Sequence, residues 1–536
     1  MVSPLDLDTE SASPRTDWSP LNVLFTLLLV AGSFLPFFAA YHHHTYLNDD
    51  TYITLTYAQN LARGNGFVYN HTPPTFGTTT PLLTIIVAVL GALLPTIEVH
   101  VVAVIFTALC WLGTAWLPFL FRRAWRLSAW QAALVGLAIL GTGWVAFLGM
   151  EVYLFAFLLM LTISLFYAER PFLAGFGAGL LYLTRGEGII VWVLLAMLSL
   201  AHQWRQRGTL DFRLLREPLI LSLGFAIPVG FWTGYALLTF GTVLPNTLRA
   251  KQAQGALDSG RPMLERLAQE WMPTWGRRFP AGRMPYFNLW WLLAIVGIAN
   301  AAVSESKRRW LALAAWIAMY LAGYIILGVS AYWWYQLPVV FVAQVFVGLG
   351  MVAILEFCLT HISQAALRAL VLALVVGIAF LGFVKPIVEG IRVYQGDPRA
   401  PAYLELAQWL RENSRSSESV AFIEIGYLGY YTDNRIVDLA GLVIPEIVPH
   451  VRDGDYSWGF WQYRPDYFIY QPAFDLALGD IIRDPRFPEN YEPVVRIKGH
   501  LDADYTIYKR MPGKEISLRR SIPIPGSREF ALDYGR

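Results

Sequence analysis

The sequence predicts a polytopic α-helical membrane protein that carries a soluble α/β domain at its C-terminus. The 536-residue chain is 56% hydrophobic and only 15% charged, whereas soluble domains carry roughly 25% charged residues. The charges are also unevenly placed. Residues 390–536 hold 18 Lys/Arg and 21 Asp/Glu, while the first 389 residues hold the remaining 41 charged side chains. We therefore expect a tail (1–19), a membrane body (20–389) and a water-soluble domain (390–536).

Twelve apolar segments follow one another in the membrane body, most of them close to the roughly 20 residues that a bilayer span needs. They lie at about 20–41, 81–95, 99–120, 128–148, 150–168, 171–184, 187–202, 217–240, 286–303, 309–329, 335–356 and 365–387. The segment at 81–95 is short, because about 14 apolar residues make only ~21 Å of helix against a ~30 Å hydrocarbon core. We expect about 11 transmembrane helices, with one segment within 81–120 partial or re-entrant.

The orientation follows from the basic residues. Lys and Arg cluster at 122–126, 205–216 and 307–309, and such clusters mark cytoplasmic loops. Counting spans between them places the long loops 42–80 and 241–285, together with the soluble domain, on the outer side. The first apolar segment is expected to be a retained helix, because no basic region precedes it and no small-residue cleavage site follows.

Both long outer loops are expected to contain surface helices. The stretch from Asp50 to Ala62 places Ile53, Tyr57 and Leu61 on one face, which suits a helix lying along the membrane surface, and residues 261–271 could form another. In the soluble domain we expect a helix at about 401–413 and strands near 420–425, 435–439, 466–470, 493–498 and 504–509, which together indicate a small α/β domain.

Composition disfavours several partners. The net charge of +2 without a single-sign run gives no reason to expect nucleic acid. Cys110 and Cys358 lie in or beside apolar segments, where packing is a commoner role than a disulfide or a metal site. We expect no required cofactor and no metal site, although a divalent cation stays open. Two Asp-x-Asp patterns, at 453–455 and 502–504, are more typical of turns than of metal sites.

Two adjacent carboxylates, Asp49 and Asp50, begin the predicted helix of the first outer loop. They can cap that helix and complement its dipole. Alternatively, one of them is a general base at the water–lipid boundary, since neighbouring carboxylates repel and raise one pKa toward the range useful for proton abstraction. The residue pattern leaves both roles open.

Several fragments resemble a known superfamily. The run DDTYITLTYAQNLARGNGFVYN at 49–70, followed by GTTTPL at 77–82, resembles the first outer loop of the GT-C membrane glycosyltransferases. Shorter fragments agree in order: GME at 149–151, LTRGEG at 183–188, LPNT at 244–247, IGYLGYY at 425–431 and VDLAGL at 437–442. Within this superfamily the chain is similar to the mycobacterial terminal β-(1→2)-arabinofuranosyltransferase and its bacterial relatives, although Gly186 stands where relatives usually have proline.

The resemblance implies transfer of a sugar, with inversion, from a polyprenyl-phosphate donor to a hydroxyl of a glycan or protein. It also implies an outer-face active site in the bacterial cytoplasmic membrane, so the expected partners are the lipid-linked sugar, a glycan acceptor and the bilayer. The catalytic acid of the family falls on Asp49 or Asp50, and Asp50 is slightly favoured. A base there would take the acceptor's proton, and the departing lipid phosphate would need cations.

Three cations are candidates for the phosphate. Arg185 sits in a very short outer turn, where a lone guanidinium is costly without a partner. A salt bridge to Glu187 or Glu151, or snorkelling to the headgroups, is an equally weighted alternative. Arg249 and Lys251 follow LPNT in the second long outer loop, and they could instead belong to an ordinary interfacial helix.

Glu151, Glu187 and Trp334 are candidates for contacts with the sugar or acceptor. For Glu151, a helix-terminus carboxylate is the commoner role, and Trp334 lies in a Tyr-Trp-Trp-Tyr run (332–335) that fits an interfacial aromatic belt. A polytopic membrane protein with an outer domain could also be a transporter or a scaffold. A transporter or flippase would show repeated halves and charges near the bilayer midplane, and the sequence shows neither. A non-catalytic scaffold stays possible if the acids prove dispensable.

Overall fold

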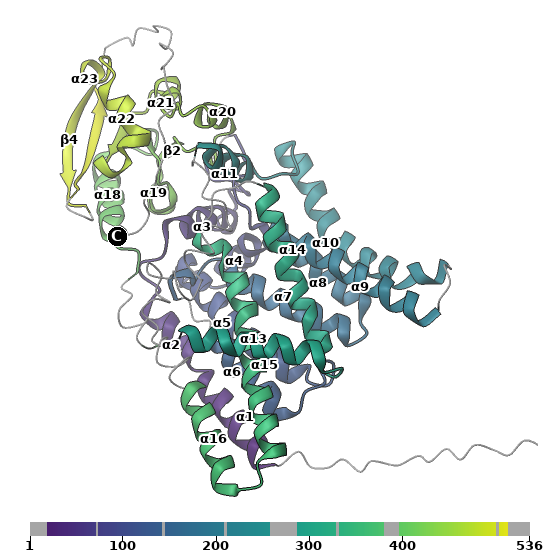
Figure 1. Ribbon diagram of the computed structural model, residues 1–536. Helices are drawn as coiled ribbons and strands as arrows, with labels where there is room; N and C mark the ends of the chain where they lie inside the picture. The colour runs from purple at the N-terminus through teal and green to yellow at the C-terminus, as the bar shows by residue number, and fades with distance from the viewer. Residues whose placement is uncertain are drawn as a thin grey trace, which may run out of the picture.

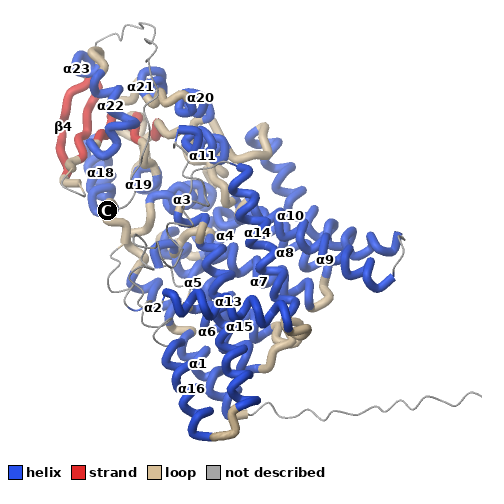
Figure 2. The backbone as a smooth tube through the Cα atoms, in the orientation of Figure 1, coloured by secondary structure: helices blue, strands red, loops and turns tan. Residues whose placement is uncertain are grey.

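The computed structural model describes residues 19–70, 73–141, 145–207, 212–257, 287–327, 332–379, 388, 396–499 and 503–512. It shows a helical body with a smaller α/β domain packed on one end (Figure 1). Figure 2 shows that the strands belong to that smaller domain, while the body is built from helices.

Apart from α3 (Asp49–Ala62) and α11 (Asn246–Leu257), which lie in the predicted outer loops, the body helices overlap the predicted apolar segments. Within the described residues, six apolar helical stretches are long enough to cross a membrane and six more are shorter. This confirms a polytopic membrane protein, while the number of spans near 11 stays a prediction. The helices are α1 (Pro20–Gly32), α2 (Leu35–His42), α3 (Asp49–Ala62), α4 (Pro81–Leu93), α5 (Val99–Leu120), α6 (Ala129–Leu140), α7 (Val152–Tyr167), α8 (Pro171–Thr184), α9 (Ile189–Arg207), α10 (Arg216–Phe240), α11 (Asn246–Leu257), α13 (Phe287–Val303), α14 (Leu311–Leu327), α15 (Leu337–His361) and α16 (Ala365–Ala379).

Glycines let the body helices approach closely. A Cβ added at Gly175 of α8 would lie 1.9 Å from the carbonyl oxygen of Leu221 in α10. One added at Gly350 of α15 would lie 2.0 Å from the carbonyl oxygen of Leu293 in α13. Small residues at such crossings are how helices pack in lipid, where no hydrophobic force draws them together.

The basic loop at 307–309 marks one end of the body. Lys307, just before α14, forms an ion pair with Glu356 near the end of α15. The end of α14 and the start of α15 lie at the other end of the body, on the side of the α/β domain (Figure 1). The basic loop at 307–309 and the α/β domain therefore lie at opposite ends of the helices, as the predicted orientation requires, and the side of the membrane stays a prediction.

The α/β domain is built on a five-stranded sheet with the order β2-β1-β3-β5-β4. β1 runs parallel to β2 and β3, whereas β5 is antiparallel to β3 and β4. Parallel neighbours need crossover connections, and helices supply them. The small α/β domain is therefore confirmed. Its elements are α18 (Ala400–Asn413), β1 (Ser419–Phe422), α19 (Gly426–Tyr431), β2 (Arg435–Asp438), α20 (Val448–Arg452), α21 (Ser457–Tyr463), β3 (Tyr467–Tyr470), α22 (Asp475–Arg483), α23 (Phe487–Asn490), β4 (Tyr491–Ile497) and β5 (Tyr505–Arg510).

Helix α3 forms where the sequence predicts a helix, and protein covers much of it. It packs between α4 and α19. Tyr52 and Thr56 are buried together with Ile53 and Tyr57, so more than one face of the helix is covered by protein. The apolar face of α3 is therefore covered by protein, and the position of this helix relative to the membrane surface stays a prediction. The helix expected at 261–271 lies outside the described residues.

Candidate functional site

A cavity of about 330 Å³ lies at the end of the body that meets the α/β domain. Its walls come from α3, the loop before α4, the ends of α7, α8 and α14, the start of α11, and one loop of the α/β domain. Six of the eight predicted site residues line it, and Asp49 and Arg249 do not. The charged side chains at its wall are Asp50, Glu151, Arg185, Glu187 and Lys251.

Asp50 faces this cavity from the first turn of α3. The backbone N–H of Asp50 donates to the side-chain oxygen of Asn48, the N-cap, at 3.0 Å, which fixes where the helix begins. The Asp50 side chain is half-buried. In the described part of the chain its carboxylate has no hydrogen-bond or ion-pair partner, so it is available to accept a proton from a ligand.

Asp49 points instead toward the α/β domain and is 3% exposed. Its two carboxylate oxygens accept the backbone N–H groups of Gly426 and Tyr427, each at 2.9 Å. These N–H groups begin α19 and have no partner within that helix, so Asp49 caps α19 across the domain interface. Burial raises the pKa of Asp49 well above its usual range, Glu424 acts in the same direction, and the two N–H donors oppose the rise. The structure therefore separates two adjacent acids that the sequence pattern could not distinguish.

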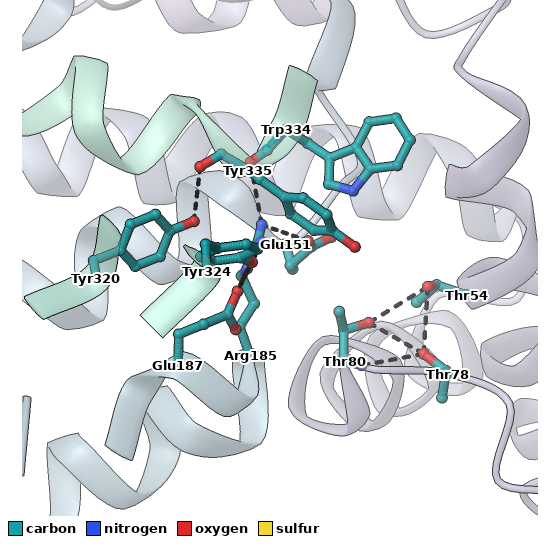
Figure 3. A network of polar contacts seen from close by, with 10 residues as sticks. All are labelled: Thr54, Thr78, Thr80, Glu151, Arg185, Glu187, Tyr320, Tyr324, Trp334 and Tyr335. Carbon is teal, nitrogen blue, oxygen red and sulfur yellow. Dashed lines mark hydrogen bonds and ion pairs between the residues drawn. The ribbon is translucent and has the colours of Figure 1, made fainter. Parts of the chain in front are cut away.

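Arg185 lies at the end of α8 and its side chain is 3% exposed. Its guanidinium donates to Glu151 Oε1 at 3.2 Å and to Glu187 Oε1 at 3.0 Å. It also donates to the Tyr324 hydroxyl at 2.9 Å and to the Trp334 carbonyl at 3.2 Å, as Figure 3 shows. A further bond from Nε to Glu187, at 3.4 Å, engages the last of its five N–H groups. The structure therefore shows the ion pairs that the sequence allowed, and all five N–H groups of Arg185 have protein acceptors. A role of Arg185 toward a phosphate stays a prediction.

Lys251 is the cation at the cavity wall without a carboxylate partner among the described residues. Its side chain is 9% exposed, and its Nζ lies 3.9 Å from the ring centroid of Tyr332 and 5.8 Å from that of Trp334. Aromatic faces stabilise a cation only modestly compared with a counter-ion. Arg249, two residues earlier in α11, is exposed and lies outside the cavity lining.

A loop of the α/β domain completes the cavity. Asp438, at the end of β2, accepts the backbone N–H groups of Ala440 and Val443 at 2.9 and 2.8 Å, and burial raises its pKa to about 6. The Asn246 side-chain amide at the start of α11 donates to the carbonyls of Leu442 and the preceding glycine at 3.1 and 2.7 Å. Leu442 itself lines the cavity. The LPNT and VDLAGL fragments therefore meet, and Asn246 fixes the start of the helix that carries Lys251.

Sequence reasoning missed the hydroxyl groups of the site. The hydroxyls of Thr54, Thr78 and Thr80 lie 3.3–3.4 Å from one another and line the cavity apart from the Arg185 network (Figure 3). In the sequence, Thr78 and Thr80 belong to the threonine run before α4, which served only as part of the resemblance, and Thr54 lies in α3. Tyr324 gave no signal, because tyrosines in or beside apolar runs are common at membrane interfaces, and Tyr335 stood out only as part of the aromatic run at 332–335.

Within the described ranges, no cluster of three or more His, Cys, Asp or Glu side chains could hold a metal ion. Asp455 of the first Asp-x-Asp pattern accepts the Ser457 hydroxyl at 2.7 Å and the Trp458 N–H at 3.0 Å, which is a turn and capping role. Asp502 of the second pattern lies outside the described residues.

Comparison with known proteins gives one sequence match. Residues 391–509 match the model of a family described as "Domain of unknown function (DUF8728)". No curated protein matches the chain.

Solved structures match nearly the whole chain. One is ArnT from Cupriavidus metallidurans bound to undecaprenyl phosphate, at 13% identity and a TM-score of 0.56, covering 92% of this chain and 99% of that one. Its apo structure matches at 14% identity and a TM-score of 0.55, covering 90% and 97%. The oligosaccharyltransferase AglB from Archaeoglobus fulgidus, in complex with an inhibitory peptide and a dolichol-phosphate, matches at 12% identity and a TM-score of 0.55, covering 90% and 74%.

These likenesses show a shared fold. The chain has the GT-C fold, a polytopic helical body followed by a C-terminal domain, as the resemblance of the first outer loop predicted. The finer resemblance to arabinofuranosyltransferases stays a prediction.

Proposed function

We propose that this protein is a membrane glycosyltransferase, which moves a sugar from a polyprenyl-phosphate donor to a hydroxyl of a glycan or protein acceptor at the outer face of the membrane. One observation carries the proposal: the Asp50 carboxylate and the Lys251 ammonium line one cavity, and neither has an ionic partner in the described part of the chain. An acid and a cation left open in a shared space suit a reaction that moves a proton and releases an anion. Lipid phosphates bound to ArnT and AglB, which share the fold, support the same donor class.

In this mechanism Asp50 is the general base. The acceptor hydroxyl donates its proton to the Asp50 carboxylate while its oxygen bonds to the anomeric carbon of the sugar. The bond from that carbon to the phosphate oxygen breaks on the opposite face, so the anomeric configuration inverts. Asp50 suits this role better than Asp49, because both oxygens of Asp49 are already bonded to the N-terminus of α19.

Lys251 stabilises the leaving lipid phosphate. A phosphate would supply the counter-ion that Tyr332 and Trp334 only partly replace. Arg185 takes no direct part, since its donors hold Glu151 and Glu187 in place. The second oxygens of those carboxylates, and the neighbouring aromatic rings, are then available to hydroxyls and faces of the sugar.

A transfer assay in proteoliposomes tests the proposal. Undecaprenyl-phosphate sugars, including arabinofuranose and hexoses, would be offered with a glycan acceptor. We expect Asp50→Asn to lower kcat by roughly 10²–10⁴-fold while the affinity for undecaprenyl phosphate stays within twofold. Lys251→Gln should weaken that affinity by about tenfold or more. Arg249→Gln is the matched control, because it removes an exposed cation from the same helix.

Full transfer activity of Asp50→Asn would refute the proposed base. If the wild-type protein translocated labelled lipid-linked sugar across the bilayer and transferred none, the chain would be a flippase, which is the alternative function weighed from the sequence.

A further inference from the structure

The wall of the cavity carries more negative than positive charge. Among the described residues that line it, three are acidic and two are basic. These are Asp50, Glu151 and Glu187 against Arg185 and Lys251. A bound ligand therefore meets an excess of carboxylate oxygens.

Neither cation is free for an anionic group on the sugar. All five N–H groups of Arg185 are engaged by protein acceptors. Lys251 is the cation left open, and under the proposed function it faces the lipid phosphate. A second negative charge on the donor would find no positive group in the described wall.

The acids that hold Arg185 still have accepting capacity. Glu151 and Glu187 each bond through Oε1, and no hydrogen bond reaches Oε2 of either within the described ranges. A carboxylate oxygen accepts hydrogen bonds and donates none when ionised. These oxygens therefore suit sugar hydroxyls or an ammonium group and repel a carboxylate.

A second wall of the cavity offers hydroxyls. Thr54, Thr78 and Thr80 bond to one another only at 3.3–3.4 Å, which is long for O–H···O bonds. They can exchange these weak contacts for hydroxyls of a ligand. Carboxylates on one wall and threonine hydroxyls on another match a polyhydroxyl ring.

We infer that the site selects a donor whose sugar is neutral or carries an amino group, and rejects acidic sugars such as uronic acids. The inference rests on the proposed function, because that function assigns Lys251 to the phosphate. Glu151 and Glu187 are its specificity-determining residues. Like charges brought together in a desolvated site are strongly disfavoured, so we expect a uronic acid donor to bind at least about 100-fold more weakly than the matching neutral sugar.

Binding and transfer measured separately test this inference. The probes are undecaprenyl-phosphate-linked glucose, glucosamine and glucuronic acid. The second and third each differ from glucose at one carbon, C2 or C6, and all three share lipid and phosphate. Dissociation constants would be measured for the full-length protein in nanodiscs. We expect glucose and glucosamine to bind within tenfold of each other and glucuronic acid to bind at least about 100-fold more weakly.

Charge-removing variants assign the effect to residues. Glu187→Gln and Glu151→Gln keep the side-chain size and an accepting oxygen, and each should reduce the discrimination against glucuronic acid by roughly tenfold. Both variants are tested because either substitution could disrupt the hydrogen bonds of Arg185 and prevent folding. Thermal unfolding identifies a variant that fails to fold. Glu405→Gln, an exposed position on α18, is the matched control and should leave the ratio unchanged.

The inference would be overturned if the wild-type protein bound the glucuronic acid donor as tightly as the glucose donor, whether or not sugar is transferred. Discrimination without transfer of any sugar would support this selectivity and refute the proposed function, so the two failures are distinguishable.

Discussion

At Gly426 the α/β domain packs tightly against helix α3, which carries Asp49 and Asp50. A Cβ added there would lie 1.9 Å from the main-chain carbonyl oxygen of Asp49 and 2.7 Å from its carbonyl carbon. Real Cβ atoms do not approach other atoms within 3.0 Å. The substitution Gly426→Ala must therefore push α19 away from α3 by about an ångström or more.

The expected cost follows from the contacts that this displacement breaks. Asp49 would lose the N–H donors of Gly426 and Tyr427, both now at 2.9 Å. Hydrogen bonds to a charged group are each worth about 1.5–3 kcal/mol, and a buried carboxylate left without partners costs about 3–5 kcal/mol. We expect the interface to weaken by about 3–5 kcal/mol, enough to release the α/β domain for a measurable fraction of the time.

Hydrogen exchange of the purified full-length protein measures this release directly. Residues 426–431 and 49–62 should lose protection together, and transfer activity should fall because the domain carries Leu442 to the cavity. Gly234→Ala in α10 is the matched control, since a Cβ there meets nothing within 4 Å. Exchange rates for Gly426→Ala equal to those of this control would refute the reasoning.

Three further outcomes are expected. Burial raises the pKa of Asp438 from 3.8 to about 6, so the folded state binds the proton more tightly, and the free energy of unfolding should fall by up to about 3 kcal/mol as pH rises from about 4 to about 6. Thermal unfolding across this window should show a pH dependence that Asp438→Asn lacks, and equal slopes for the two proteins would contradict the assignment. Asn246→Ala removes two hydrogen bonds to the α/β domain and should lower the free energy of unfolding by about 1–3 kcal/mol. It should also weaken undecaprenyl phosphate binding several-fold, because α11 carries Lys251; unchanged binding would show that the position of Lys251 does not depend on Asn246. Arg185→Gln should lower stability by about 3–5 kcal/mol, since it leaves buried carboxylates without their cation, and a variant of normal stability with weak donor binding would instead place Arg185 on the phosphate.

The membrane body could be predicted from the sequence because lipid imposes a local rule. A span needs an uninterrupted apolar run, and the twelve runs predicted from composition overlap the apolar helices of the structure. The strands of the α/β domain were predictable for a similar reason, since short apolar stretches separated by turns carry their own signal. The setting of α3 was not predictable, because an apolar face packed on lipid and one packed on protein look alike in sequence.

The cavity itself was only partly predictable. Arg185, Glu151 and Glu187 stood out because charges are rare in the body, but the bonds among them depend on the ends of α7 and α8 meeting in space. The adjacent acids could not be told apart, since which of them faces the cavity depends on α19, more than 370 residues away. Lys251 and Arg249 differ for the same reason: successive positions on one helix point in different directions, and only the packing decides which is buried.

The charges of the site fall into two groups, those that protein groups compensate and those that have no partner within the described residues. An ionisable group near the membrane is costly unless something compensates it. Arg185 and Asp49 are compensated by protein groups, so their presence is explained without a ligand. Asp50 and Lys251 are half-buried or buried, lie on one cavity and have no such compensation within the described residues. A ligand that brings a hydroxyl proton to Asp50 and a phosphate to Lys251 would supply what both lack. The most informative experiment on this chain is therefore the pair Asp50→Asn and Lys251→Gln, because one should lower catalysis and the other donor affinity.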